Sequence, residues 1–139
     1  MTNTAFVTKS DVFINVIFNG DNTSEINSDW IREKQKIIEN YSNKEKLIEE
    51  RIELCKTKLL EINKLNPWWK FWHSKNERKE IDKLKSSISS LELEKRVLPK
   101  HKNDDVYIKL CEFLVMKGYA LTNTKIGFYD SVETWTKYD

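Results

Sequence analysis

The sequence has few of the residues that interrupt helices: three glycines and two prolines among 139 residues. Because lysine, glutamate, isoleucine and leucine are abundant, this scarcity favours long helices over an all-β fold. Three glycines are also too few for the usual glycine-rich loops that hold phosphates, and neither GxGxxG nor GxxxxGK[ST] occurs. The length predicts a single domain spanning residues 1–139.

Cysteine and histidine are equally scarce, with two of each. Cys55 and Cys111 lie in apolar helical contexts, which predicts buried free thiols in a reducing, cytoplasmic setting. His73 and His101 are separated by a predicted helix, so they cannot share a metal ion. No nucleophile stands beside a base at the spacing that catalysis needs. We therefore expect no enzyme activity, no catalytic residue, no metal and no cofactor.

Long apolar runs are also missing. No stretch approaches the roughly 18 apolar residues that a membrane span needs. The start, MTNTAFVTKSDVF, does not have the basic and then apolar regions of a signal peptide. Charge is nearly balanced at +2, but residues 31–74 and 75–102 carry +3 and +4, whereas residues 1–30 and 103–139 carry −3 and −2. A basic middle between acidic ends indicates an acidic partner or mutual attraction of these regions.

The first predicted element is a strand over residues 11–19, expected to be central because apolar side chains occur on both of its faces. Turn residues follow at Asn19–Asn22. A helix is then predicted from Ser28, which has the side chain of an N-terminal cap. The capping-box spacing of Ser42 and Glu45 predicts a break or kink near residues 40–43.

Heptad patterns predict an antiparallel coiled-coil hairpin over residues 43–98. The first helix repeats apolar residues at Ile31, Ile38, Ile52 and Leu59, with a companion series at Tyr41, Ile48, Cys55 and Ile62. The second repeats them at Ile81, Leu84, Ile88, Leu91 and Leu98. Glu45 and Lys95 interrupt these seams. The second helix is predicted to start at Ser74 and to end at Pro99.

The rest of the chain predicts a small base formed by residues 1–42 and 99–139. Asn103 is predicted to cap a third, buried helix over residues 104–117, with Gly118 ending it. YALTNT predicts a strand, and residues 127–138 fit either a strand or a short helix. The fold class is therefore α+β and helix-dominated, with the hairpin projecting from a base of two or three β-strands and a third helix.

The candidate site is the aromatic tip of the hairpin, residues 66–73, within LNPWWKFWHSK. Asn66 and Pro67 predict one helical turn in which Trp68, Phe71 and Trp72 share a side. These rings either plug the end of the seam or anchor a partner. The predicted partner-binding residues are Trp68, Trp69, Lys70, Phe71, Trp72, Lys75 and Arg78.

The functional hypothesis is a non-catalytic protein-binding module in a regulatory or inhibitory role, for example a phage or mobile-element protein that blocks a host enzyme. Two alternatives stay open. The lysine-rich hairpin fits an accessory nucleic-acid-binding protein, and tryptophan beside lysine fits a peripheral membrane-surface binder. Apolar residues off the seams also leave room for a homodimer.

Overall fold

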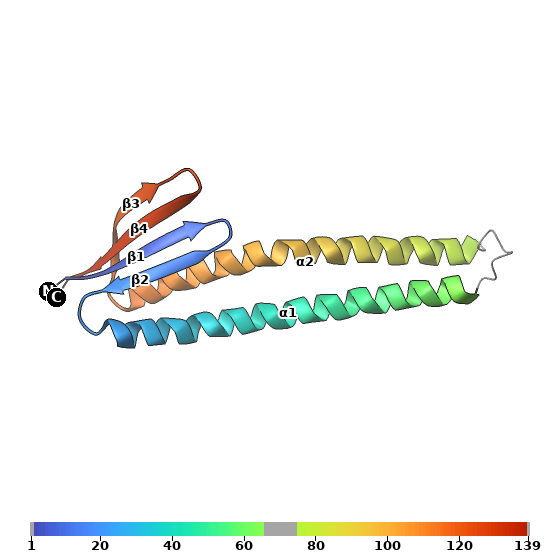
Figure 1. Ribbon diagram of the computed structural model, residues 1–139, viewed down its shortest axis with the longest axis horizontal. Coiled ribbons are helices and arrows are strands. Elements are labelled where there is room, and N and C mark those ends of the chain that lie inside the picture. The colour runs from blue at the N-terminus through green and yellow to red at the C-terminus, as the bar shows by residue number, and fades with distance from the viewer. Residues whose placement is uncertain (1, 66–74, 139) are drawn as a thin grey trace. The chain divides into compact units, whose positions relative to one another are not determined.

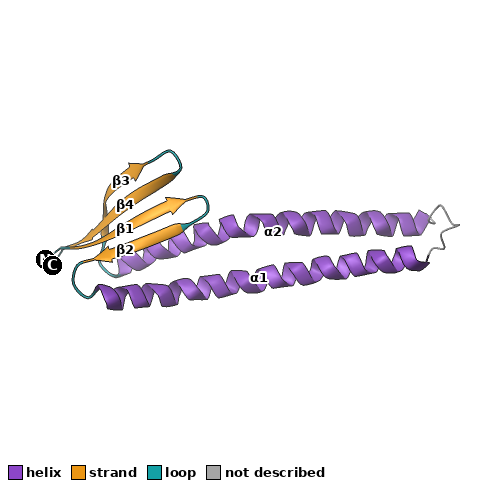
Figure 2. Ribbon diagram, in the orientation of Figure 1, coloured by secondary structure: helices purple, strands orange, loops and turns teal. Residues whose placement is uncertain are grey.

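The computed structural model describes residues 2–65 and 75–138 (Figure 1). The chain divides into two compact units, which are described one at a time. The first, here called the sheet unit, is formed by Met1–Tyr41 and Pro99–Asp139. The second, here called the hairpin unit, is Ser42–Leu98. The elements follow the order β1, β2, α1, α2, β3, β4, which makes a helix-dominated α+β protein (Figure 2).

The sheet unit contains a four-stranded antiparallel sheet in the order β2-β1-β4-β3. Its strands are β1 (Asn3–Ser10), β2 (Ile14–Asn19), β3 (Ala120–Ile126) and β4 (Asp130–Lys137). The strand predicted at residues 11–19 is present as β2, but its predicted central position was wrong, because β2 lies at an edge. Its neighbour β1 was not predicted at all. The sequence left residues 127–138 open between strand and helix, and β4 resolves this in favour of a strand.

One face of the sheet forms the core of this unit with the adjoining parts of both helices. Alternate side chains of β1 and β2, including Ala5, Val7, Ile14 and Phe18, are buried. Trp30 packs against Phe113 with ring centroids 5.6 Å apart, which joins the two helical segments within this unit. Each large aromatic side chain buried here contributes a few kcal/mol through lost water contact.

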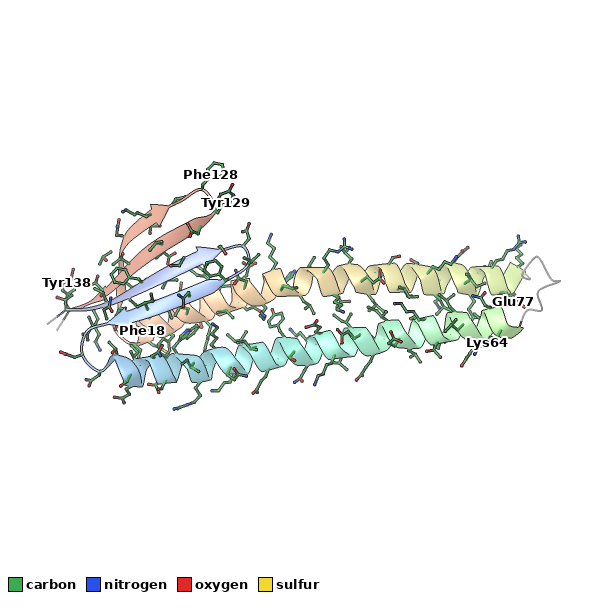
Figure 3. All side chains as sticks on the ribbon, in the orientation of Figure 1. Phe18, Lys64, Glu77, Phe128, Tyr129 and Tyr138 are labelled. Carbon is green, nitrogen blue, oxygen red and sulfur yellow. The ribbon has the colours of Figure 1, made fainter. Side chains whose placement is uncertain are left out.

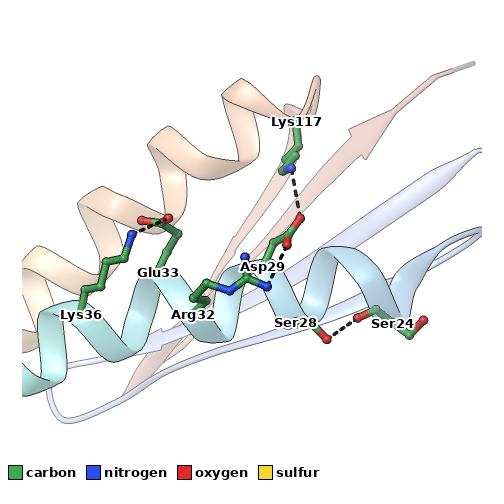
Figure 4. Close-up of polar contacts among 7 residues, drawn as sticks. All are labelled: Ser24, Ser28, Asp29, Arg32, Glu33, Lys36 and Lys117. Atoms are coloured by element: carbon green, nitrogen blue, oxygen red, sulfur yellow. Dashed lines mark hydrogen bonds and ion pairs between the residues drawn. The ribbon is translucent and has the colours of Figure 1, made fainter.

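The first helix, α1, spans Thr23–Leu65 without interruption, so the predicted break near residues 40–43 was wrong. The helix also begins before the predicted cap: the Ser28 hydroxyl donates to the Ser24 carbonyl at 2.9 Å, as an interior residue does (Figure 4). Tyr41 is buried and its hydroxyl donates to Asp105, which joins α1 to α2 within the sheet unit.

The heptad placement at the start of α1 needs one correction. Ile31 is 56% exposed, whereas its neighbour Trp30 is 3% exposed. From Trp30 to Tyr41 the buried face advances by an eleven-residue spacing, near 3.67 residues per turn, rather than by heptads. Extending the coiled-coil period back to Ile31 therefore selected the wrong side of the helix.

The second helix, α2, spans Lys75–Met116 and contains Pro99 in its interior. The predicted end at Pro99 and the separate third helix were therefore wrong, since the described residues contain one continuous helix here. Pro99 is exposed within this helix, where a proline removes one backbone hydrogen bond. Asn103 does not cap a helix: it is 7% exposed and serves another contact, described below.

The predicted role of Gly118 is confirmed. Its φ is 90°, and its N–H donates to the Val115 carbonyl at 3.0 Å while the Tyr119 N–H donates to the Leu114 carbonyl at 2.9 Å. These two bonds form a Schellman motif, which ends the helix and turns the chain into β3. Lys117, next to the glycine, forms an ion pair with Asp29 of α1 at 3.3 Å (Figure 4).

In the hairpin unit, the parts of α1 and α2 between Ser42 and Leu98 run antiparallel (Figure 1). Ile48 and Ile52 of the predicted seam are buried, and the seam residues of α2 are half-buried. Lys95, which interrupts the apolar series of α2, forms an ion pair with Glu49 at 2.9 Å. The hydrogen bond and charge of Glu49 raise the pKa of Lys95. The polar seam position is thus matched by a partner across the hairpin.

Candidate functional site

Most of the predicted partner-binding residues lie outside the described part of the chain. Trp68, Trp69, Lys70, Phe71 and Trp72 belong to residues 66–74, so the plug and the anchor both stay predictions. The other two predicted residues, Lys75 and Arg78, are exposed in the first turn of α2.

A different candidate surface lies at one end of the sheet, and sequence reasoning missed it. Both β-hairpin turns lie at this end, because Ser10 at the end of β1 pairs with Asp130 at the start of β4 (Figure 1). Their large apolar side chains are exposed. We call this surface the sheet-end patch: Val12 (85% exposed), Phe13 (46%), Ile126 (87%), Phe128 (92%) and Tyr129 (85%). Apolar residues gathered in this way mark interaction sites more often than single ones do.

Ser10 organises the first turn of this patch. Its Oγ accepts from the backbone N–H groups of Val12 (3.3 Å) and Phe13 (3.2 Å), and its own N–H donates to the Phe13 carbonyl at 2.9 Å. This is the local hydrogen bonding by which serine stabilises tight turns. The turn therefore presents Val12 and Phe13 from a defined backbone.

Asn103 ties the same turn to helix α2. Its Nδ2 donates to the Ser10 carbonyl at 2.8 Å, and its side chain is buried. A buried amide of this kind is costly to leave unpaired, so the contact fixes the turn against the helix. The residue that the sequence suggested as a cap for its own helix instead positions a turn more than 90 residues away.

The second turn of the patch, between β3 and β4, places two aromatic residues at its tip. The Gly127 N–H donates to the Asp130 carbonyl at 2.7 Å, and a Cβ at Gly127 would lie 2.9 Å from that oxygen. Phe128 and Tyr129 stack edge-to-face with centroids 4.9 Å apart, and both project from the turn (Figure 3). A GFYD turn carries aromatic residues where asparagine or aspartate is usual, which was the available sequence signal.

Charges of both signs lie next to the patch in sequence. Asp11 and Asp130 are acidic, whereas Lys9 and Lys125 are basic, and the Lys9 Nζ lies 4.0 Å from the centroid of the Tyr107 ring. The exposed aromatic and aliphatic side chains between them are of the kind found at the centre of protein–protein interfaces.

Behind the patch, Glu133 of β4 is the centre of a buried polar cluster. It is 7% exposed and accepts hydrogen bonds from the Tyr107 hydroxyl and from Trp135 Nε1, the latter at 3.1 Å. Burial and the bond to Glu133 raise the pKa of Tyr107. Burial also raises the pKa of the neighbouring Cys111 thiol. A thiol held protonated in this way is a poor nucleophile. We therefore interpret the cluster as a structural part of the core and not as a reactive site.

The described residues were also compared with the requirements of a ligand pocket, a metal site and a membrane-spanning helix. A polar hollow of about 160 Å³ beside the start of α1 has both acidic and basic walls, with Asp29 and Lys117 among them. Within residues 2–65 and 75–138 no three histidine, cysteine or acidic side chains come together as a metal site would require. In the same ranges, no helix combines the length and apolar character needed to cross a bilayer. Both cysteines are free thiols.

Comparisons with known proteins identify no relative: no family model, curated protein or solved structure matches this chain.

Proposed function

We propose that this protein is a non-catalytic, cytoplasmic protein-binding module with a regulatory or inhibitory role. The observation that carries the proposal is the sheet-end patch, in which two turns at one end of the sheet expose five large apolar side chains. A folded chain gains stability by burying such groups, so their joint exposure on ordered turns is best explained by a partner that covers them. The free cysteines fit the reducing compartment that the proposal assigns.

The turns also favour binding because they are held before a partner arrives. Ser10 and Asn103 fix one turn, and the Gly127–Asp130 bond closes the other. A surface already in its bound geometry loses less conformational entropy on association. Phe128 and Tyr129 are the expected anchors, since exposed aromatic side chains carry a large share of binding energy at interfaces.

The test uses a triple variant, Val12→Ser, Phe128→Ser and Tyr129→Ser. These side chains are 85–92% exposed, so the free energy of unfolding should change by less than about 0.5 kcal/mol per site. The matched control is Ile108→Ser, Val115→Ser and Met116→Ser, three exposed apolar residues of α2 (55%, 63% and 82%). Each protein is immobilised and incubated with extract from the native host, and the captured protein is then purified for calorimetry.

The expected result is that the patch variant binds the captured protein at least about tenfold more weakly, while the control binds like the wild type. Equal binding by the wild type and the patch variant, with unchanged melting of both, would refute the role of the patch. A third variant, Trp68→Ala with Trp69→Ala and Trp72→Ala, tests the predicted aromatic tip in the same assay. The Lys-rich hairpin as a nucleic-acid surface and the tip as a membrane binder stay predictions.

A further inference from the structure

The free edge of β2 is an interaction surface separate from the sheet-end patch. Edge strands leave every second residue with an N–H and a C=O that have no partner in the sheet. The bond from the Ser10 N–H to the Phe13 carbonyl sets which residues these are. Since Ser10 and Phe13 face one another, Asn15, Ile17 and Asn19 bond to β1 by alternation. The backbone groups of Ile14, Val16 and Phe18 therefore point away from the sheet.

The two edges of this sheet differ in how they are protected. The β3 edge has an irregular register between Leu121 and Asn123 and a lysine at Lys125, two devices that hinder pairing with another strand. The β2 edge has neither: it reads INVIFN, without charge or proline, and its register with β1 is unbroken over the whole strand. The side chains of Ile14 and Phe18 are buried in the core, so the strand that carries the open groups is held firmly.

Charge at the two ends of β2 selects the kind of strand that fits. Asp11 lies just before the strand and Asp21 just after it, both exposed, and no charged residue lies between Ile14 and Asn19. We propose that the β2 edge binds an extended segment of a protein partner, antiparallel to β2, with an uncharged alternating centre and a basic residue at each end. The proposal rests on the protein-binding function but not on the sheet-end patch.

A second copy of the chain fits this edge less well. In the symmetric register that pairs all the open groups, Val16 faces Val16 of the other copy and Ile14 faces Phe18. The same register places Asp11 opposite Asp21 of the other copy at both ends. Like charges that face one another oppose pairing, whereas lysine or arginine at these positions is attracted. Self-association is therefore the alternative that the experiment must distinguish.

The probe is the capped peptide Lys-Ser-Thr-Val-Thr-Val-Thr-Val-Thr-Ser-Lys. With its central valine opposite Val16, its outer valines lie opposite Ile14 and Phe18 and its lysines lie opposite Asp11 and Asp21. One control peptide has glutamate at both ends, and another has proline in place of the central valine. Each is titrated into the isotopically labelled full chain at low salt, with amide chemical shifts and hydrogen exchange as readouts. The matched protein variants are Val16→Pro, which removes the central outward N–H, and Val16→Thr, which keeps it.

Three results are expected. In the free protein, the amides of Ile14, Val16 and Phe18 exchange quickly and those of Asn15, Ile17 and Asn19 slowly, and the lysine peptide protects the first set. The glutamate peptide binds at least about fivefold more weakly, a difference that shrinks with added salt. Val16→Pro weakens binding at least about fivefold, the equivalent of one backbone hydrogen bond, and Val16→Thr does not.

Several outcomes overturn the proposal. Slow exchange of the first three amides in the dilute free protein means that the edge is already covered. Protection that rises with protein concentration without peptide assigns the edge to a second copy. Equal binding of the lysine and glutamate peptides removes the charge argument. If Val16→Pro does not fold, the exchange pattern of the wild type and the proline peptide decide alone. Unchanged capture by the sheet-end patch variant would refute the role of the patch and would leave all these readouts unaffected, so the two proposals fail separately.

Discussion

Replacing Glu133 with alanine should destabilise the sheet unit more than any change on its surface. The carboxylate accepts from two donors, the Tyr107 hydroxyl and Trp135 Nε1; Glu133 and Trp135 are buried, and Tyr107 is partly buried against the core. Hydrogen bonds to a charged group are worth about 1.5–3 kcal/mol each, and a buried donor left unpaired loses its hydration as well. Losing both bonds should cost about 3–5 kcal/mol in the free energy of unfolding.

The comparison with Glu133→Gln makes this reasoning testable. Glutamine keeps one oxygen for Trp135 Nε1 and offers an N–H to the Tyr107 oxygen, so the cost should be only about 1 kcal/mol. Glu133→Leu has the bulk but no acceptor and should resemble alanine. Urea unfolding followed by tryptophan fluorescence and circular dichroism measures all three variants. The reasoning would be refuted if Glu133→Ala lowered the free energy of unfolding by less than about 0.5 kcal/mol. It would also be refuted if Glu133→Gln lowered it as much as Glu133→Ala does.

Three further predictions concern other contacts of the sheet unit. The hydrogen bond to Asp105 raises the pKa of Tyr41 to about 12. The stability that this contact adds should therefore be complete below pH 10 and be lost as the pH rises through about 12. In alkaline unfolding curves, Tyr41→Phe should abolish that loss. Gly118→Ala should lower stability by about 1 kcal/mol in thermal melts, because a φ of 90° strains any residue with a Cβ; an unchanged melting temperature would contradict the Schellman role. Trp30→Ala should cost about 3–5 kcal/mol by the same measurement, through the cavity left beside Phe113.

The elements predicted best were those with strong local signals. Gly118 was recognisable as a helix end, and the apolar period of the hairpin identified Ile48 and Ile52 as core residues. The errors came where tertiary contacts outweighed a local preference. Pro99 has the local signature of a helix end, yet α2 continues through it from Lys75 to Met116. Asn103 has the signature of a cap, but its amide bonds to the Ser10 carbonyl across the fold.

The sheet was harder to predict because its pairing is non-local. The strand β1 reads NTAFVTKS, with only weak alternation, and its burial depends on two neighbours that the sequence does not reveal. Apolar residues on both sides of β2 suggested a central strand, but Phe13 and Ile17 are exposed and one edge of β2 is open. The sheet-end patch escaped notice for the same reason, since it exists only because β1 and β4 bring two distant turns together.

The pairing of β1 with β4 also sets the order in which the sheet can form during synthesis. The two central strands are its most distant partners in sequence, joining Asn3 to Lys137 at one end and Ser10 to Asp130 at the other. Until β4 leaves the ribosome, β1 and β2 form at most an isolated two-stranded hairpin, which is marginal in water. The helices can form early from local contacts. During this time the apolar face of β2 and its backbone edge both stay exposed to solvent. We therefore expect the nascent chain to be most prone to aggregation in the interval between the synthesis of β2 and that of β4.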